Sequence, residues 1–109
     1  MKEYLAVKEN NKHITHIKVE THYDLGGINF ATYKTKPRGY YLSVLPVERS
    51  TTSYGVTMES YTAFSGYCDV LKTVTRKSKK AEAEAEQIAE TRKQSMIEFV
   101  LEKHGLELA

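Results

Sequence analysis

Basic side chains are the most numerous group in this sequence that could do chemistry. Residues 72–80 contain no acid and carry five cations: Lys72, Arg76, Lys77, Lys79 and Lys80. A second basic stretch stands beside a tyrosine: Lys34, Lys36, Arg38 and Tyr40. Cations neutralise the phosphates of a nucleic acid, and a neighbouring aromatic ring stacks on its bases. The two stretches therefore indicate nucleic-acid binding as one candidate function, although a solvated charged surface explains them too and no recognised nucleic-acid-binding motif supports it.

Three glutamates follow the basic stretch at a spacing of four residues: Glu82, Glu86 and Glu90. On a helix this spacing places them on one face, where like charges repel one another. Such an acidic face suits a partner, and it also serves simply to keep a surface soluble. The chain contains eight tyrosines, a residue type that is enriched at protein interfaces. These features indicate protein binding as the other candidate function, with the three glutamates on the partner face of the helix.

Catalytic and metal-binding groups are sparse. Cys68 is the only cysteine, and the sequence contains two aspartates and no Gly-x-Ser-x-Gly motif. Because free cysteine is commonly buried, we expect Cys68 to be a buried or half-buried small side chain on a helix. His13 and His16 would point to opposite faces of a strand, whereas His16 and His22 share a face but lie about 20 Å apart. We therefore expect no enzyme activity, no metal site and no cofactor.

The size and composition of the chain are those of one ordinary globular domain. It has 109 residues, of which 40% are hydrophobic and 28% charged, and its formal net charge is only +2. A chain of this length can form one core, but not a deep enclosed substrate cavity as well. A single cysteine suits a reducing compartment, and no apolar run approaches the length of a membrane span. We therefore expect a single domain, residues 1–109, in the cytoplasm and not in a membrane.

Residues 1–64 have the pattern of an antiparallel sheet. They are rich in tyrosine, valine, isoleucine and threonine, which favour strands. Residues 13–23 alternate as a strand with one dry and one wet face does, and glycine and proline turns separate the segments. Pro46 has no N–H to donate, so we expect pairing to fail or bulge near it. We predict a meander of four or five strands at 4–8, 13–23, 28–34, 40–47 and 54–62.

Residues 65–105 have the pattern of a helical region. Apolar residues recur at helical spacing, with Ser65 or Thr62 as a candidate N-cap and Gly105 as a candidate C′ residue. The change from basic to acidic residues near Ser78 favours a break there. We therefore predict a short helix at 66–77 and a long C-terminal helix at 79–104. One continuous helix is the alternative, because no glycine or proline interrupts residues 67–104.

The long predicted helix is longer than the predicted strands that would pack against it. The helix would measure about 39 Å, whereas a strand of seven residues spans only about 23 Å. Because such a sheet cannot cover the whole helix, we expect the alanine-rich half, residues 81–89, to project or to meet another molecule. A second copy of the chain could cover it, so a homodimer through the long helix is one expected assembly.

Several segments resemble those of small uncharacterised accessory proteins carried by bacterial conjugative elements and phages. They are residues 36–44 (Lys-Pro-Arg-Gly-Tyr-Tyr-Leu-Ser-Val), 59–61, 64–66 and 76–78. The resemblance implies a non-enzymatic binder that tunes host or element machinery. Inhibitors of CRISPR nucleases belong to the same population of small single-domain proteins, so inhibition of a host defence nuclease follows by analogy. The combined expectation is an α+β protein-binding accessory factor, with a nucleic-acid-binding regulator as the alternative.

Overall fold

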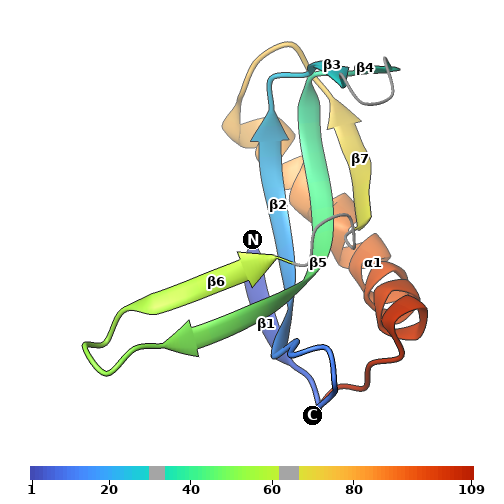
Figure 1. Cartoon of the computed structure of the whole chain (residues 1–109). Coiled ribbons are helices and arrows are strands. Elements are labelled where there is room, and N and C mark those ends of the chain that lie inside the picture. The colour runs from blue at the N-terminus through green and yellow to red at the C-terminus, as the bar shows by residue number, and fades with distance from the viewer. Residues whose placement is uncertain (30–33, 62–66) are drawn as a thin grey trace.

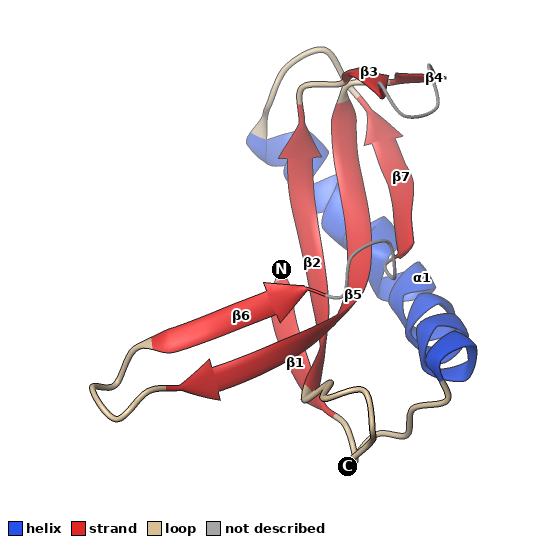
Figure 2. Cartoon of the chain, in the orientation of Figure 1, coloured by secondary structure: helices blue, strands red, loops and turns tan. Residues whose placement is uncertain are grey.

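The computed structural model describes residues 1–29, 34–61 and 67–109. Within these ranges the chain forms an antiparallel sheet and one long C-terminal helix, which confirms the predicted α+β class (Figures 1 and 2). The elements in chain order are β1 (Lys2–Ala6), β2 (His16–Asp24), β3 (Gly27–Asn29), β4 (Lys34–Lys36), β5 (Gly39–Thr51), β6 (Thr57–Tyr61), β7 (Tyr67–Thr73) and α1 (Lys79–His104).

The five-stranded sheet is organised around β5, its longest strand. The order is β1-β2-β5-β6, and β7 also pairs with β5. Along one edge of β5, the β7 pairing ends at Val44 and the β6 pairing begins at Val47. Along the other edge, pairing with β2 continues through Pro46 without a register shift, so the expected bulge is absent from this ladder. The change of partner beside Pro46 divides β5 into a part within the main sheet and a part that leaves it with β6.

The strand predicted at 28–34 does not join this sheet. Strands β3 and β4 pair with each other in a separate two-stranded ribbon at one end of the molecule (Figure 1). Residues 30–33 of the predicted strand lie outside the described residues. The sheet is therefore a meander interrupted by this ribbon between β2 and β5.

The hydrophobic core lies between one face of the sheet and α1. The dry face predicted for residues 13–23 is confirmed, because Ile17 and Val19 are fully buried. Each such side chain contributes about 1.5–3 kcal/mol through removal from water. Lys18 on the opposite face is buried as well, which the simple alternation does not explain. The main core contacts come from β2, β5 and α1: Ile17, Val19, Leu42, Val44, Ala85, Ala89 and Val100.

The predicted short helix at 66–77 is wrong, because residues 67–73 form strand β7 along the edge of β5. The sequence showed apolar residues at helical spacing here. A register shift in β5–β7 pairing, opposite Tyr40 and Tyr41, sets Leu71 out of the regular pairing and into the core. This bulge breaks the two-residue alternation that would have identified a strand. The candidate N-caps Ser65 and Thr62 lie outside the described residues.

The long predicted helix is confirmed as α1, with the expected ends. The Ser78 hydroxyl accepts a hydrogen bond from the Ala81 N–H at 3.0 Å, as an N-cap does. At the other end Gly105 has φ 63°, a left-handed conformation in which glycine is least strained. The helix thus begins after Ser78 and ends before Gly105 because of local signals that the sequence carries.

The expectation that the alanine-rich half of this helix projects is wrong. Ala81, Ala85 and Ala89 are 6%, 1% and 0% exposed, and they pack in the core with the apolar residues of the C-terminal half. β5 has 13 residues and β2 has nine, so the sheet is longer than the seven-residue strand on which the estimate rested. The face that a second copy was expected to cover is therefore covered by the chain's own sheet.

Candidate functional site

The two basic stretches of the sequence meet at one end of the fold. The Val74 N–H donates to the Arg38 carbonyl at 3.1 Å, and Arg38 Nη1 donates to the Thr75 carbonyl at 3.3 Å. These contacts join the segment after β4 to the loop between β7 and α1. We call this region the basic end, and it comprises Lys34, Lys36, Arg38, Lys72, Arg76, Lys77, Lys79 and Lys80.

Several cations of the basic end already have partners within the chain. Lys36 forms an ion pair with Asp24 at 2.9 Å, and this hydrogen bond lowers the pKa of the Asp24 carboxyl. Lys72 forms an ion pair with Glu84, and the Lys77 ammonium lies 5.3 Å from the centre of the Tyr23 ring. The carboxylates partly neutralise the charges of Lys36 and Lys72 before any ligand arrives, whereas Lys77 keeps its full charge beside the ring.

Three other cations of the basic end are exposed. Arg76 and Lys79 have no partner among residues 1–29, 34–61 and 67–109, while the charge of Lys80 helps to lower the pKa of the Glu84 carboxyl. They flank Ser78, so they surround the N-terminus of α1, where the helix dipole also favours negative charge. This is the part of the basic end that remains available to an external anion.

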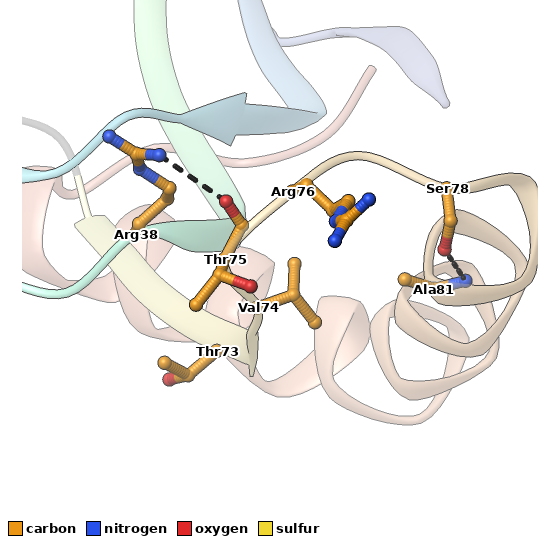
Figure 3. A pocket seen from close by; sticks show the side chains of 7 residues that line it. All are labelled: Arg38, Thr73, Val74, Thr75, Arg76, Ser78 and Ala81. Carbon is orange, nitrogen blue, oxygen red and sulfur yellow. Dashed lines mark hydrogen bonds between the residues drawn. The ribbon is translucent and has the colours of Figure 1, made fainter.

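A groove opens beside these residues (Figure 3). It has a volume of about 550 Å³ and is lined by Arg38, residues 73–76, Ser78 and Ala81. Figure 3 shows Arg76 on the loop between β7 and the first turn of the helix, with Arg38 on the other side of Thr75. No acidic side chain is among the described residues that line the groove.

Two tyrosines near the basic end, Tyr40 and Tyr41, are buried and do not provide a stacking surface. Tyr40 is 6% exposed and Tyr41 is 5% exposed. The Tyr40 ring lies 5.3 Å from that of Tyr23, edge to face, within the core. Burial therefore removes Tyr40 from the candidate binding surface, and the basic end offers cations without an adjacent exposed ring from Tyr40 or Tyr41.

The predicted acidic face of the helix is only partly available. Glu86 accepts hydrogen bonds from the Met1 ammonium at 2.8 Å and from the Thr21 hydroxyl. Glu90 pairs with Lys93 at 3.1 Å, while Glu82 is exposed near the helix N-terminus. The spacing of the three glutamates thus reflects in part the attachment of α1 to the sheet.

Cys68 is exposed on strand β7, so the expectation of a buried or half-buried residue on a helix is wrong. Its sulfur lies 3.6 Å from the Ser43 hydroxyl, which in turn lies 3.5 Å from Nδ1 of His22. Both distances are at the long limit for a hydrogen bond. In this chain of contacts the histidine reaches the thiol only through Ser43, so it is not placed to take a proton from Cys68 directly. The arrangement is a polar patch on the outer face of the sheet.

A second surface, which the sequence reasoning missed, is a two-stranded arm formed by residues 47–61. It consists of the end of β5 paired with β6, and it projects from the rest of the sheet (Figure 1). Three apolar side chains on it are exposed: Tyr54 at 92%, Val56 at 57% and Met58 at 57%. The available signal was the run of nine residues from 50 to 58, which carries no charge.

A polar cluster fixes the base of the arm to the main sheet. Glu59 of the arm accepts a hydrogen bond from the Tyr4 hydroxyl and lies 3.3 Å from Lys18 Nζ. Arg49 of the arm lies 3.4 Å from Glu59 and stacks at 3.9 Å on the Tyr4 ring. This cluster covers the outer face of β2 and explains why Lys18 is buried.

Neither a metal centre nor a membrane-spanning helix is found among the described residues. Among the described residues, no group of three or more histidine, cysteine or acidic side chains could hold a metal ion. No helix in the same ranges combines the length and the apolar character needed to cross a membrane. No known family model, no curated protein and no solved structure matches the chain.

Proposed function

We propose that this chain is a non-enzymatic protein-binding accessory factor that engages its partner through the arm. The observation that carries the proposal is the exposure of Tyr54, Val56 and Met58 on a projecting two-stranded ribbon. An isolated two-stranded ribbon is marginally stable in water, and exposed apolar side chains add no stability to it. Contact with a partner would bury these side chains and stabilise the ribbon.

The edges of the arm support the same proposal. Among residues 1–29, 34–61 and 67–109, strand β6 pairs with β5 alone, so within these ranges its other edge has no strand beside it. Proteins commonly protect such edges with lysine or proline, and β6 contains neither, although it carries Glu59 at its base. Met58 is exposed on β6, and Tyr54 and Val56 are exposed in the adjoining turn, so this edge and the tip of the arm are suited to the addition of an extended strand from another protein. We therefore expect the partner to contribute a strand and a small apolar pocket.

We also propose a class of protein as the partner. The resemblance to accessory proteins of mobile elements and phages favours a bacterial host protein, and a defence nuclease such as a CRISPR effector is the first candidate. We place the interaction in the cytoplasm, where the single Cys68 would remain reduced. The arm would act by occupying a surface that the nuclease needs, without chemistry of its own.

A lysate capture experiment tests the proposal. The immobilised protein is incubated with nuclease-treated bacterial lysate, and a specific protein should be retained and identified by mass spectrometry. The double variant Tyr54→Ser and Met58→Ser should retain at least about tenfold less, because the buried apolar area is lost. The matched control is Leu25→Ser, which removes an apolar side chain that is 68% exposed outside the arm. Equal retention by the wild type and the arm variant would exclude the arm as the contact.

A direct assay tests the named class of partner. Target cleavage by a purified CRISPR effector is measured with and without the wild-type protein and the arm variant. Inhibition of cleavage by the wild-type protein, without inhibition by the arm variant, supports a defence nuclease as the partner. Unchanged cleavage would exclude the tested effectors as partners. A protein retained in the capture experiment would then identify a different partner.

Nucleic-acid binding is the second candidate function, and the meeting of the two basic stretches at one end favours it. With Tyr40 and Tyr41 buried, such binding would rest mainly on phosphate contacts and would weaken steeply with salt. Reversing the charge of Arg76, Lys77, Lys79 and Lys80 to glutamate should abolish a gel shift. The first turn of α1 tolerates acidic residues, so the variant should stay folded by circular dichroism. An unchanged shift would exclude the basic end as the contact.

A further inference from the structure

The edge of β6 that faces away from β5 has no strand beside it in the part of the chain that the structure describes, and its pattern of residues is complementary to itself. We propose that two copies of this chain pair through this edge, antiparallel and with Thr57 of each copy at the two-fold axis. The inference goes beyond the proposed function, because it names a second copy as an occupant of the arm. A host protein that adds a strand to the same edge would have to displace that copy.

The backbone of β6 presents donors and acceptors on this edge. The Thr52 N–H donates to the Val56 carbonyl at 2.8 Å, so these two residues form a hydrogen-bonded pair at the tip of the arm. Bonded and non-bonded pairs alternate along an antiparallel ladder, so the peptide groups of Thr57, the next residue, face away from β5. Arg49 occupies another non-bonded position of the ladder, and its N–H donates to the Thr15 hydroxyl at 2.8 Å and not to β6. Thr57 is therefore placed to exchange two hydrogen bonds with Thr57 of a second copy.

The apolar side chains of the arm also pair when Thr57 lies on the axis. In this register Val56 of one copy stands opposite Met58 of the other, on both sides of the axis. Both side chains are 57% exposed in the single chain, and residues two apart in an extended segment share one face. Centring the pairing on Met58 would instead set Val56 opposite Ser60. Centring it on Glu59 would set two carboxylates opposite each other, which destabilises a strand pair.

The opposite face of the arm carries threonines. Thr51 and Thr57 are cross-strand partners within the arm, and their hydroxyl oxygens lie 3.4 Å apart. Pairing at the axis would bring the Thr57 side chains of the two copies together and extend this pair into a row of four threonines. Cross-strand threonine pairs stabilise antiparallel sheets. Residues 50–58 carry no charge, so no like charges face each other within this stretch.

The size of the contact sets its strength. Three exposed apolar side chains from each copy and a short strand pair fall well below the roughly 800 Å² per partner of a standard stable interface. We therefore expect a weak dimer that forms at high protein concentration and yields to a stronger partner. Figure 1 shows the arm projecting from the sheet, so antiparallel arms would place the two bodies at opposite ends. Because both copies use the same edge, the assembly closes at two chains.

Sedimentation of the purified full-length chain over a range of concentrations tests the inference. The average mass should rise from the 12.4 kDa of the monomer towards twice this value and no further. Thr57→Lys places like charges at the axis and should weaken the association at least about tenfold. The matched control, Thr51→Lys, changes the same residue type on the neighbouring strand away from the axis and should weaken it less than about threefold. Both side chains are exposed, so circular dichroism should show both variants folded.

A chain that stays monomeric at every concentration would overturn the inference. A dimer that the two lysine variants weaken equally would overturn it as well, because the contact would then lie elsewhere. No other protein is present in this measurement, so its failure leaves the lysate capture result intact. A failed capture likewise leaves the measured mass intact, and the two proposals can fail separately.

Disulfide trapping tests the register. In a Cys68→Ser background, Val56→Cys and Met58→Cys are mixed under mild oxidation, so that each copy carries a single thiol on the arm. The proposed register sets these two positions opposite each other in a non-hydrogen-bonded pair, where the Cα atoms lie about 4.5 Å apart and a disulfide can form. The mixed dimer should exceed its statistical share of one half. An excess of the Met58→Cys homodimer would instead show a register centred on residue 58 and overturn the place of Thr57 at the axis.

Discussion

Glu59 of β6 accepts a hydrogen bond from the hydroxyl of Tyr4 in β1, although 55 residues separate them in the chain. The same carboxylate faces Lys18, whose side chain is only 10% exposed. It also faces Arg49 at 3.4 Å, although Arg49 Nε makes no hydrogen bond. Glu59 therefore contacts two strands of the main sheet and lies beside two cations. This carboxylate helps to hold the base of the arm against β1 and β2.

Replacing this carboxylate is expected to destabilise the protein. Glu59→Gln should lower the free energy of unfolding by about 1–2 kcal/mol, because the buried Lys18 would lose one of its two neighbouring carboxylates and keep Glu20 at 3.4 Å. The measurement is urea denaturation followed by circular dichroism. Glu107→Gln is the matched control, since its ion pair with Lys8 is exposed and should contribute less than about 1 kcal/mol. A loss no larger than that of the control would show that the cluster does not stabilise the fold.

The close contact between α1 and the sheet depends on small side chains. Ala89 is fully buried, so Ala89→Leu should force the helix away from the sheet and lower the free energy of unfolding by about 1–3 kcal/mol. Ala83→Leu makes the same change on the exposed face and should alter stability by less than about 0.5 kcal/mol. Thermal and urea denaturation of both variants provide the measurement. Equal stability of the two would contradict the packing of the alanine-rich half.

The helix could be predicted from the sequence because its signals are local. Ser78 caps one end, Gly105 ends the other, and the apolar repeat between them has a period close to 3.6. Its surroundings could not be predicted, because they depend on strand lengths. β5 runs to Thr51, beyond the predicted end at residue 47, and this extension both lengthens the sheet and creates the arm.

Strand β7 and the candidate sites show the same limit. Leu71 is displaced by a bulge whose position is set by pairing with β5, so no local pattern in residues 67–74 could reveal it. The cations of the basic end could be identified from the sequence, but not the fact that they lie together. That depends on contacts of Arg38 with Val74 and Thr75, which are more than 30 positions later in the chain. The burial of Cys68 was predicted wrongly for the same reason, because the strand on which Cys68 is exposed was predicted as a helix.

The attachment of α1 to the N-terminus should give the protein a specific acid sensitivity. Burial raises the pKa of Glu86, but hydrogen bonds from the Met1 ammonium and the Thr21 hydroxyl lower it more, so the pKa lies below that of an ordinary glutamate. A carboxyl with a lowered pKa in the folded state contributes stability above its unfolded pKa, and that contribution is lost as the pH falls through the folded pKa. Glu86→Gln should therefore be less stable than the wild type near neutral pH.

The same linkage predicts how the difference changes with pH. The wild type and Glu86→Gln should converge in stability as the pH falls from about 5 to about 2, since Glu86 becomes protonated in both states there. Urea denaturation at a series of pH values measures this convergence. Glu82→Gln, which changes an exposed carboxylate four residues earlier, is the control and should stay close to the wild type throughout. A gap between the wild type and Glu86→Gln that does not depend on pH would show that Glu86 acts by packing and not by its charge.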